Sequence, residues 1–162
     1  MSNFTYSEAG LAFTRRFEGL RLTAYPDAAG VWTIGYGHTG PGVHEGLTIT
    51  EHQAEVFLEC DIPRAAAGVN RLVTAPIAQN QFDALVDFAF NLGVAALSSS
   101  VLLRHLNSGE FASAADEFLK WDHSKGRIIS GLLLRREAEA DLFSQPPLNQ
   151  PPTSPAQPSR AR

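Results

Sequence analysis

The stretch RRFEGLRLTAYPDAAGVWTIGYGHTG, residues 15–40, decides which fold this chain can adopt. At its start, apolar residues spaced i, i+3 and i+4 complete a predicted helix, with Ser7 as the N-cap and Gly19 as the stop. Further along, β-branched and aromatic residues stand on both sides of PDAAG, where Asp27 and Gly30 suit the first and fourth positions of a type I turn. The stretch therefore predicts a small β-hairpin, residues 22–37, directly after the first helix.

The second predicted helix begins at a sequence signal for an N-terminus. Thr50 and Gln53 have the spacing of a capping box, and apolar positions continue from there toward residue 72. Pro63 and Gly68 are expected to bend or break this helix, because proline lacks the backbone donor that an internal turn requires.

The remaining patterns are helical as well. A third helix follows Pro76 and carries an apolar face that ends at Gly93. Three more are expected at residues 98–109, 110–121 and 130–143, the first and last with serine N-caps. The sequence therefore predicts an α+β fold that is predominantly helical.

Composition divides the chain into a domain and a tail. Residues 145–162 hold six of the ten prolines and few large apolar side chains, so we predict a folded domain at 1–144 and a proline-rich, disordered tail at 145–162. The domain holds 11 basic and 17 acidic residues, a net charge of −6. This balance argues against a nucleic-acid partner, which would favour a basic surface.

Two further features bear on the environment of the protein. No apolar run approaches the roughly 18 residues that span a bilayer, and MSNFTYSEAG lacks the basic and apolar regions of a signal peptide, so we expect no stable membrane insertion. Cys60, the single cysteine, lies in AEVFLECDI and is expected to be a small buried hydrophobe of the second helix.

Glu18 stands where local physics disfavours an acid. The field at a helix C-terminus destabilises a carboxylate in the last turn by a few tenths to ~1 kcal/mol, and a hairpin folded over that end would also desolvate it. Both effects favour the neutral acid that a general acid must supply. The alternative is a solvated glutamate at a poor helical position.

Asp27 and Thr33 have ordinary structural explanations when each is taken alone, as a turn residue and a strand residue. Together with Glu18 they acquire a chemical one. An acid at a helix end and an acid at a hairpin turn can face one gap, as the two carboxyl groups of a glycoside hydrolase do, with Thr33 holding a water. The hairpin also carries aromatic rings on which sugars could stack, although hairpin packing explains them equally well: Tyr25, Trp32 and Tyr36.

The spacing E-x8-D-x5-T, here Glu18, Asp27 and Thr33, together with TIGYGHT, resembles the catalytic signature of phage-type lysozymes, the endolysins of the kind made by phages T4 and P22. The resemblance covers about residues 8–143. Its other parts are ITEHQAEVFLECDI, QFDALVDFAFNLG and KWDHSKGRIISGLLLRREAEADLF.

The resemblance implies a lysozyme-like fold, with a small hairpin lobe, a larger helical lobe and a cleft between them. It implies hydrolysis of the β-1,4 bond between N-acetylmuramic acid and N-acetylglucosamine in peptidoglycan, without metal or cofactor. Glu18 would be the general acid, Asp27 would stabilise the sugar cation or act as base, and Thr33 would position the water. We expect a monomer that stays in the host cytoplasm until a separate holin opens the membrane.

The resemblance also bears on a histidine and two arginines. His38 matches the family's histidine after GYG, and we interpret it as the structural partner of an acid across the hairpin, with a direct substrate contact as the alternative. Arg135 and Arg136 are the candidates to pair with Glu18, and such a pair would oppose the effect of the helix end.

Three other activities compete with this hypothesis. A lytic transglycosylase uses one glutamate, so Asp27 and Thr33 argue against it, and an inactive peptidoglycan-binding module would have no need to retain all three residues. A zinc amidase would require metal ligands, but the spacing of His44, His52 and Cys60 matches no short zinc motif.

Overall fold

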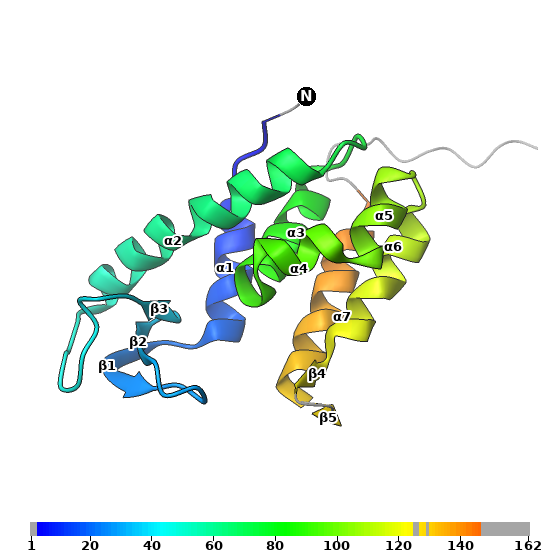
Figure 1. Cartoon of the computed structure of the whole chain (residues 1–162). Helices are drawn as coiled ribbons and strands as arrows, with labels where there is room; N and C mark the ends of the chain where they lie inside the picture. Colours follow the sequence, from blue (N-terminus) through cyan, green and yellow to red (C-terminus); the bar gives the residue numbers. More distant parts are fainter. Residues whose placement is uncertain (1–2, 125–126, 129, 147–162) are drawn as a thin grey trace, which may run out of the picture.

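The computed structural model describes residues 3–124, 127–128 and 130–146. A small sheet lobe and a larger helical lobe are joined by the long helix α2 (Figure 1). The prediction of an α+β, predominantly helical, two-lobed fold is confirmed. The elements in chain order are α1 (Glu8–Glu18), β1 (Arg21–Pro26), β2 (Trp32–Gly35), β3 (His38–Thr39), α2 (Glu51–Leu72), α3 (Gln79–Leu92), α4 (Val94–Ser99), α5 (Val101–Asn107), α6 (Phe111–Phe118), the 3₁₀ turn Leu119–Trp121, β4 (His123–Ser124), β5 (Arg127–Ile128) and α7 (Ser130–Ser144).

Both predicted ends of α1 are confirmed. The Ser7 side chain accepts a hydrogen bond from the backbone N–H of Gly10, which satisfies one of the free donors of the first turn. Gly19 has φ +68°, a conformation that costs glycine little, and its N–H bonds to the carbonyl of Arg15. The chain therefore leaves the helix directly after Glu18 and enters β1.

The sheet has one strand more than the predicted hairpin. β1, β2 and β3 form an antiparallel sheet in that order, with Tyr25 opposite Thr33 and Thr33 opposite Thr39. The β1–β2 connection closes with a hydrogen bond of 2.9 Å from the N–H of Gly30 to the carbonyl of Asp27, as a type I turn requires. A second turn after β2 returns the chain along β3, so the sheet extends one strand beyond the predicted hairpin.

Helix α2 confirms one prediction and corrects another. The Thr50–Gln53 capping box is present, but the helix continues without a break through Pro63 and Gly68. Pro63 is exposed, so water can satisfy the carbonyl that loses its donor. Gly68 lies against Val94, and its missing side chain allows α2 and α4 to approach closely.

Cys60 is exposed, and the prediction that it is buried was wrong. The buried side of α2 contains Leu58 and Ile62, four residues apart. A residue two positions from each of them lies on the opposite side of the helix. The apolar neighbours of Cys60 therefore face the core while its thiol faces solvent.

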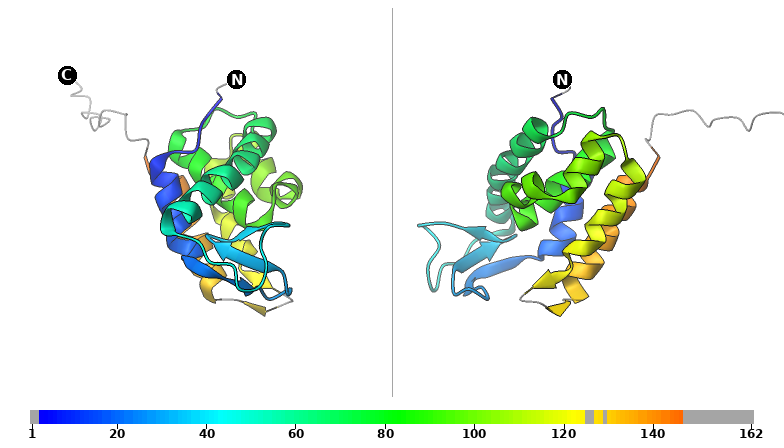
Figure 2. Two further views of the ribbon diagram at one scale, coloured as in Figure 1. Left: turned by 90° about the vertical axis from the view of Figure 1, so that its left-hand side faces the viewer. Right: turned by 45° about the vertical axis from the view of Figure 1, so that its right-hand side comes forward.

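The core belongs mainly to the helical lobe, where α3 is buried along most of its length and packs against α1, α2 and α7 (Figure 2). Phe88 of α3 meets Phe118 and Trp121 edge-on, with ring centroids 5.6 and 5.4 Å apart. Two short elements were not predicted, α4 and the β4–β5 pair. None of the helices in the described part of the chain is both long and apolar enough to cross a membrane.

The predicted domain boundary lies at the end of α7. This helix ends at Ser144, and the side-chain amide of Asn80 binds the carbonyls of Leu142 and Gln145 at 2.9 and 3.0 Å. Most of the predicted tail, residues 147–162, lies outside the described residues.

Candidate active site

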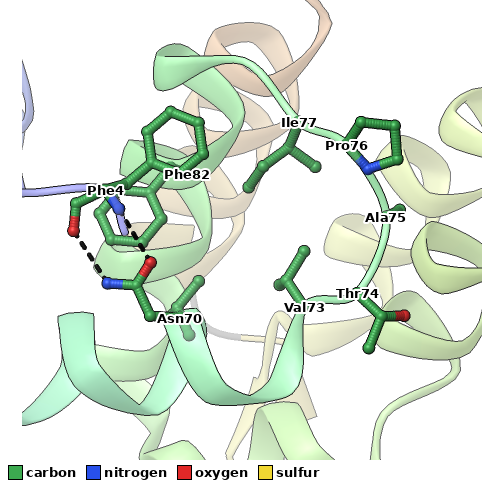
Figure 3. A pocket seen from close by; sticks show the side chains of 9 residues that line it. Phe4, Asn70, Val73, Thr74, Ala75, Pro76, Ile77 and Phe82 are labelled. Carbon is green, nitrogen blue, oxygen red and sulfur yellow. Dashed lines mark hydrogen bonds between the residues drawn. The ribbon is translucent and has the colours of Figure 1, made fainter. Parts of the chain in front are cut away.

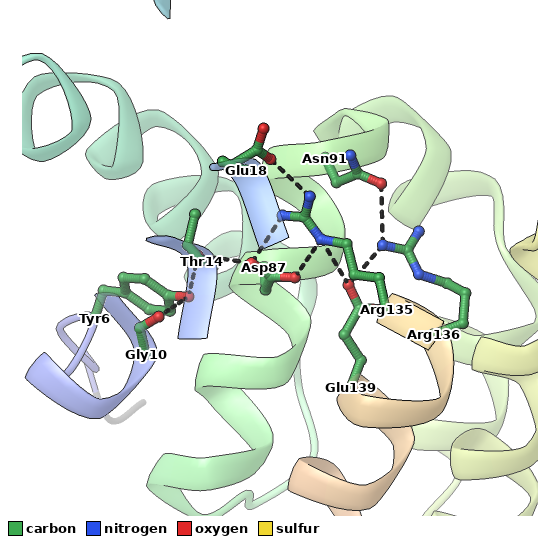
Figure 4. A network of polar contacts seen from close by, with 9 residues as sticks. All are labelled: Tyr6, Gly10, Thr14, Glu18, Asp87, Asn91, Arg135, Arg136 and Glu139. Atoms are coloured by element: carbon green, nitrogen blue, oxygen red, sulfur yellow. Dashed lines mark hydrogen bonds and ion pairs between the residues drawn. The ribbon is translucent and has the colours of Figure 1, made fainter. Parts of the chain in front are cut away.

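Glu18 lies at the junction of the two lobes. It is the last residue of α1, its side chain is 18% exposed, and its Oε1 accepts a hydrogen bond of 2.7 Å from Nη1 of Arg135 on α7 (Figure 4). Its other oxygen, Oε2, lies beside Gly37, close enough that a β-carbon there would be 3.1 Å away. Of the two arginines that were candidates to pair with Glu18, the structure selects Arg135.

Arg135 is itself held by a buried carboxylate. Nε and Nη2 of Arg135 donate to Oδ2 and Oδ1 of Asp87 at 2.8 and 2.9 Å. Oδ1 of Asp87 also accepts the Thr14 hydroxyl at 2.6 Å, and Tyr6 hydrogen-bonds to Thr14 at 2.8 Å. The network joins α1, α3 and α7, so the orientation of Glu18 depends on all three helices.

The pKa shifts within this network indicate which of its buried acids is ionised. Burial is the largest single effect and raises the pKa of Asp87, but the hydrogen bonds and charge of Arg135, together with hydrogen bonds from Glu139 and Thr14, outweigh it and hold the pKa below its usual value. Burial opposes the charge of Arg135 too, yet Asp87 and Glu18 raise the pKa of this guanidinium. At Glu139, burial outweighs the attraction of Arg136 and raises the pKa of the carboxyl well above its usual range. Asp87 is therefore the ionised partner of Arg135, and Glu139 favours its neutral form.

Glu18 lines a cavity of about 660 Å³ between the lobes. Its walls come from the sheet lobe, α2, α3 and α4, and a ligand held there would contact both lobes. The lining residues are Glu18, Gly37, Thr39, Asp61, Arg64, Ala65, Ala89, Phe90, Asn91, Gly93, Val94 and Ala95. This cavity is the cleft that the sequence predicted.

A second cavity, of about 390 Å³, lies at the far end of α2 (Figure 3). Phe4 and Phe82 stack along one wall with ring centroids 5.3 Å apart, and the side chain of Asn70 is bound by the backbone of Phe4. The residues that line it carry no acid or base. Acid–base chemistry is therefore confined, among these two cavities, to the one that contains Glu18.

Asp27 and Thr33 lie on the sheet, outside the lining of the Glu18 cavity. Oδ1 of Asp27 accepts the N–H groups of Ala29 and Val31 at 2.8 and 2.9 Å, the turn role expected of it. Thr33 is 4% exposed and its hydroxyl donates to the carbonyl of Val31 at 3.0 Å. Each of the two side chains is thus hydrogen-bonded to the backbone of its own turn. Thr39, which lies opposite Thr33 on β3, does line the cavity.

The fold and the position of Glu18 can now be compared with those of known proteins. The model of the family described as phage lysozyme matches residues 15–139. The chain belongs to the phage lysozyme family. It is 48% identical to the endolysin of Bacillus phage B103 over 139 residues, 85% of this chain and 53% of that protein, so it spans about half the length of that relative. It is 40% identical to the endolysin of Salmonella phage P22 over 141 residues, 85% of this chain and 96% of that protein.

A solved structure agrees with the sequence relatives. The muramidase domain of SpmX from Asticaccaulis excentricus superposes with a TM-score of 0.82 and 39% identity, covering 88% of this chain and 99% of that one. The lysozyme-like fold is therefore confirmed over nearly all of the described residues.

In this member of the phage lysozyme family, two of the four residues for which a sugar contact was considered hydrogen-bond to acids of the protein. The Tyr36 hydroxyl bonds to Oε1 of Glu55 at 3.1 Å. His38 pairs through Nδ1 with Oδ2 of Asp61 at 2.8 Å and stacks on Phe57 with ring centroids 4.3 Å apart. His38 thus has an acidic partner, but that acid comes from α2 and not from the hairpin.

The other two predicted sugar contacts lie along the β1–β2 pair. The guanidinium of Arg21 lies over the ring of Tyr25, 4.6 Å from its centroid, and Trp32 is half-buried opposite Pro26. Neither ring lines the Glu18 cavity.

Among the described residues, no group of three or more His, Cys, Asp or Glu side chains could hold a metal ion. His44 instead makes a local contact with the carbonyl of Glu45.

The sequence reasoning missed Asp87, Asp61 and Thr14. A signal was present for one of them: Asp87 stands within QFDALVDFAFNLG, whose other residues were assigned to an apolar core helix. A charged residue at a core position is rare unless it is paired, so this aspartate in an apolar helix indicates a cation packed against it.

Proposed function

We propose that this chain hydrolyses the β-1,4 bond between N-acetylmuramic acid and N-acetylglucosamine in peptidoglycan, with Glu18 as the general acid. By family the chain is a lysozyme-type glycoside hydrolase. The observation that carries the residue assignment is the position of the Glu18 carboxyl, largely buried and oriented by Arg135 on the wall of an open cavity of about 660 Å³.

The two carboxyl oxygens of Glu18 have different surroundings, so we assign them different roles. Oε1 accepts the hydrogen bond of Arg135, so it is fixed and already engaged. Oε2 lies toward Gly37, which lines the same cavity, and is the oxygen that would carry the proton to the glycosidic oxygen.

Asp27 and Thr33 keep their proposed roles because each has unused capacity. Oδ1 of Asp27 takes two backbone donors, which orients the carboxylate and leaves Oδ2 to stabilise a positive sugar or accept a proton from water. The hydroxyl of Thr33 donates its proton to Val31 and retains lone pairs that accept from a water. Tyr25 and Trp32 remain the proposed sugar-stacking rings, and the protein contacts of Tyr36 and His38 favour structural roles for them.

The decisive experiment is digestion of purified peptidoglycan followed by mass spectrometry of the fragments. The proposal expects reducing muramic acid ends. Anhydro-muramic ends would instead identify a lytic transglycosylase, free stem peptides an amidase, and no released fragment a binding module.

Variants of the three proposed catalytic residues then test the assignments. Glu18→Gln should abolish release while circular dichroism shows a folded protein, and Asp27→Asn and Thr33→Ala should lower kcat with smaller changes in KM. A Glu18→Gln protein that clears cell walls at the parent rate would refute the assignment of the acid.

The proposal also covers where the protein is found before and during lysis. We place the protein, as a monomer, in the host cytoplasm until a separate holin opens the membrane, after which it acts on the wall. Expression in bacteria without a holin should leave culture turbidity unchanged until chloroform permeabilises the membrane. Lysis without chloroform would contradict this order of events, and analytical ultracentrifugation tests the monomer.

A further inference from the structure

Arg135 lies between two carboxylates and serves them unequally. It gives Glu18 one hydrogen bond, from Nη1 at 2.7 Å, and gives Asp87 two, from Nε and Nη2 at 2.8 and 2.9 Å (Figure 4). Bidentate pairs between arginine and a carboxylate are stronger and better oriented than single hydrogen bonds. The guanidinium is therefore fixed primarily by Asp87, and Glu18 binds Nη1, the one nitrogen that Asp87 does not contact.

We propose that Asp87 is a positioning residue of the reaction, which takes up the charge of Arg135 so that this arginine orients Glu18 without holding it as a permanent carboxylate. The proposal rests on Glu18 being the general acid. An arginine whose charge was not compensated would stabilise the ionised form of Glu18 more strongly, and an ionised Glu18 cannot protonate a leaving oxygen.

The surroundings of Asp87 fit this role. The residue is fully buried in α3, and the Thr14 hydroxyl donates to its Oδ1 from α1 at 2.6 Å. Thr14 in turn is bonded to the hydroxyl of Tyr6, where burial raises the pKa and keeps the phenol neutral. Burial raises the pKa of Asp87, but Arg135 together with the hydrogen bonds of Glu139 and Thr14 lowers it further, so the carboxylate needed to balance the arginine is present.

The other charged groups around the network do not supply the same compensation. From α7, Arg136 is paired with Glu139 at 2.7 Å, and Nε of Arg135 is 3.7 Å from the same carboxyl, which burial disposes to be neutral. From α2, Asp61 and Arg64 face the cavity, and Asp61 is already paired with His38. Among these groups, Asp87 is thus the ionised acid that compensates the charge of Arg135 by direct contact.

A purely architectural role for Asp87 is the alternative, because the network also ties α1, α3 and α7 together. The chain supplies a matched control for it. Asp83 lies one helical turn earlier on α3, is 3% exposed and also anchors the start of α1, accepting the N–H of Ser7 at 3.2 Å and the amide of Gln79 at 2.9 Å. The described contacts of Asp83 do not include Arg135 or Glu18.

The test compares Asp87→Asn with Asp83→Asn, measuring kcat and KM for peptidoglycan across pH and confirming folding by circular dichroism. For Asp87→Asn we expect the basic limb of the kcat–pH profile to move down by about one unit, the low end of the effect of one nearby charge, and kcat at pH 7 to fall about tenfold with KM nearly unchanged. Asp83→Asn should lower thermal stability and leave the limb in place. An unmoved limb in Asp87→Asn, or an equal shift in both variants, would overturn the proposal.

A second variant covers the case in which Asp87→Asn does not fold. The double variant Asp87→Asn with Arg135→Gln removes both charges, and neutral replacement of a complete buried pair is often tolerated. Its basic limb should lie above that of the parent, because the cation that hydrogen-bonds to Glu18 is then absent; a limb at the parent position would refute the proposal. Failure of the proposed function is recognised separately, since Glu18→Gln would then retain activity.

Discussion

Replacing Gly37 by alanine tests whether the position of Glu18 is set by the close approach of the sheet lobe. Gly37 follows β2 with φ +85°, and an added β-carbon would lie 3.1 Å from Oε2 of Glu18 and 3.7 Å from its Cδ. The first of these contacts is tighter than ordinary van der Waals contact, so Glu18 or the turn must move by a few tenths of an ångström.

Two separate costs follow from this one substitution. The left-handed backbone conformation costs a non-glycine residue about 1–2 kcal/mol, which should lower the melting temperature of a domain of this size by about 2–8 °C. The displaced carboxyl should cost activity in addition. Because a misplacement of about 1 Å can cost ~100-fold in rate, a shift of a few tenths of an ångström is expected to cost roughly tenfold in kcat.

Gly46→Ala is the matched control that separates the two costs. Gly46 has φ +79°, in a loop of the sheet lobe, and an added β-carbon there meets no atom within 4 Å. Calorimetry should show similar losses of stability in both variants, and turbidity assays on cell walls should show the loss of activity only in Gly37→Ala. Equal activity of the two variants, assayed well below both melting temperatures, would refute the reasoning.

Three further predictions concern packing, titration and exposure. Gly68→Ala should destabilise the fold by about 1–2 kcal/mol in denaturant unfolding, because its β-carbon would lie 2.6 Å from both methyl groups of Val94, and Val94→Ala should restore most of the loss. Burial raises the pKa of Glu139, so its neutral side chain contributes stability at low pH, and this contribution is lost as pH rises from about 4.3, the unfolded pKa, toward the raised folded pKa. Glu139→Gln should therefore reduce the loss of unfolding free energy between pH 4 and pH 7. A loss as large as that of the parent would contradict the raised pKa. Cys60 is exposed and should react with a thiol reagent in the folded protein, so protection until unfolding would contradict its placement.

Local sequence signals predicted the parts of the site that depend on near neighbours. The stop at Gly19, the cap at Ser7 and the turn at Asp27 all involve hydrogen bonds that span at most four residues. Such contacts form from the same residues in almost any tertiary setting, so their patterns are legible in the chain. Predictions that depended on which side of a helix faces the core were less reliable, as the exposed thiol of Cys60 shows.

The unbroken helix α2 shows that tertiary packing can override a local sequence signal. Pro63 predicts a break by its chemistry, yet α2 is packed along one side against the rest of the protein and the proline lies on the exposed side. Tertiary packing stabilises the helix and outweighs the local cost. Gly68 was likewise a breaker in the sequence, and its function in the structure is to admit Val94.

The sequence by itself determined that an acid ends the first helix, that a turn aspartate and a strand threonine follow it, and that the spacing is that of the phage lysozymes. Only the tertiary structure decided which cation meets that acid. Arg135 and Arg136 are adjacent, so they point about 100° apart around α7, and the rotation of α7 against α1 selects Arg135 across 117 positions of sequence. The same packing brings Asp87 to the far side of that guanidinium, because α3 packs against both α1 and α7, the first and last helices of the chain.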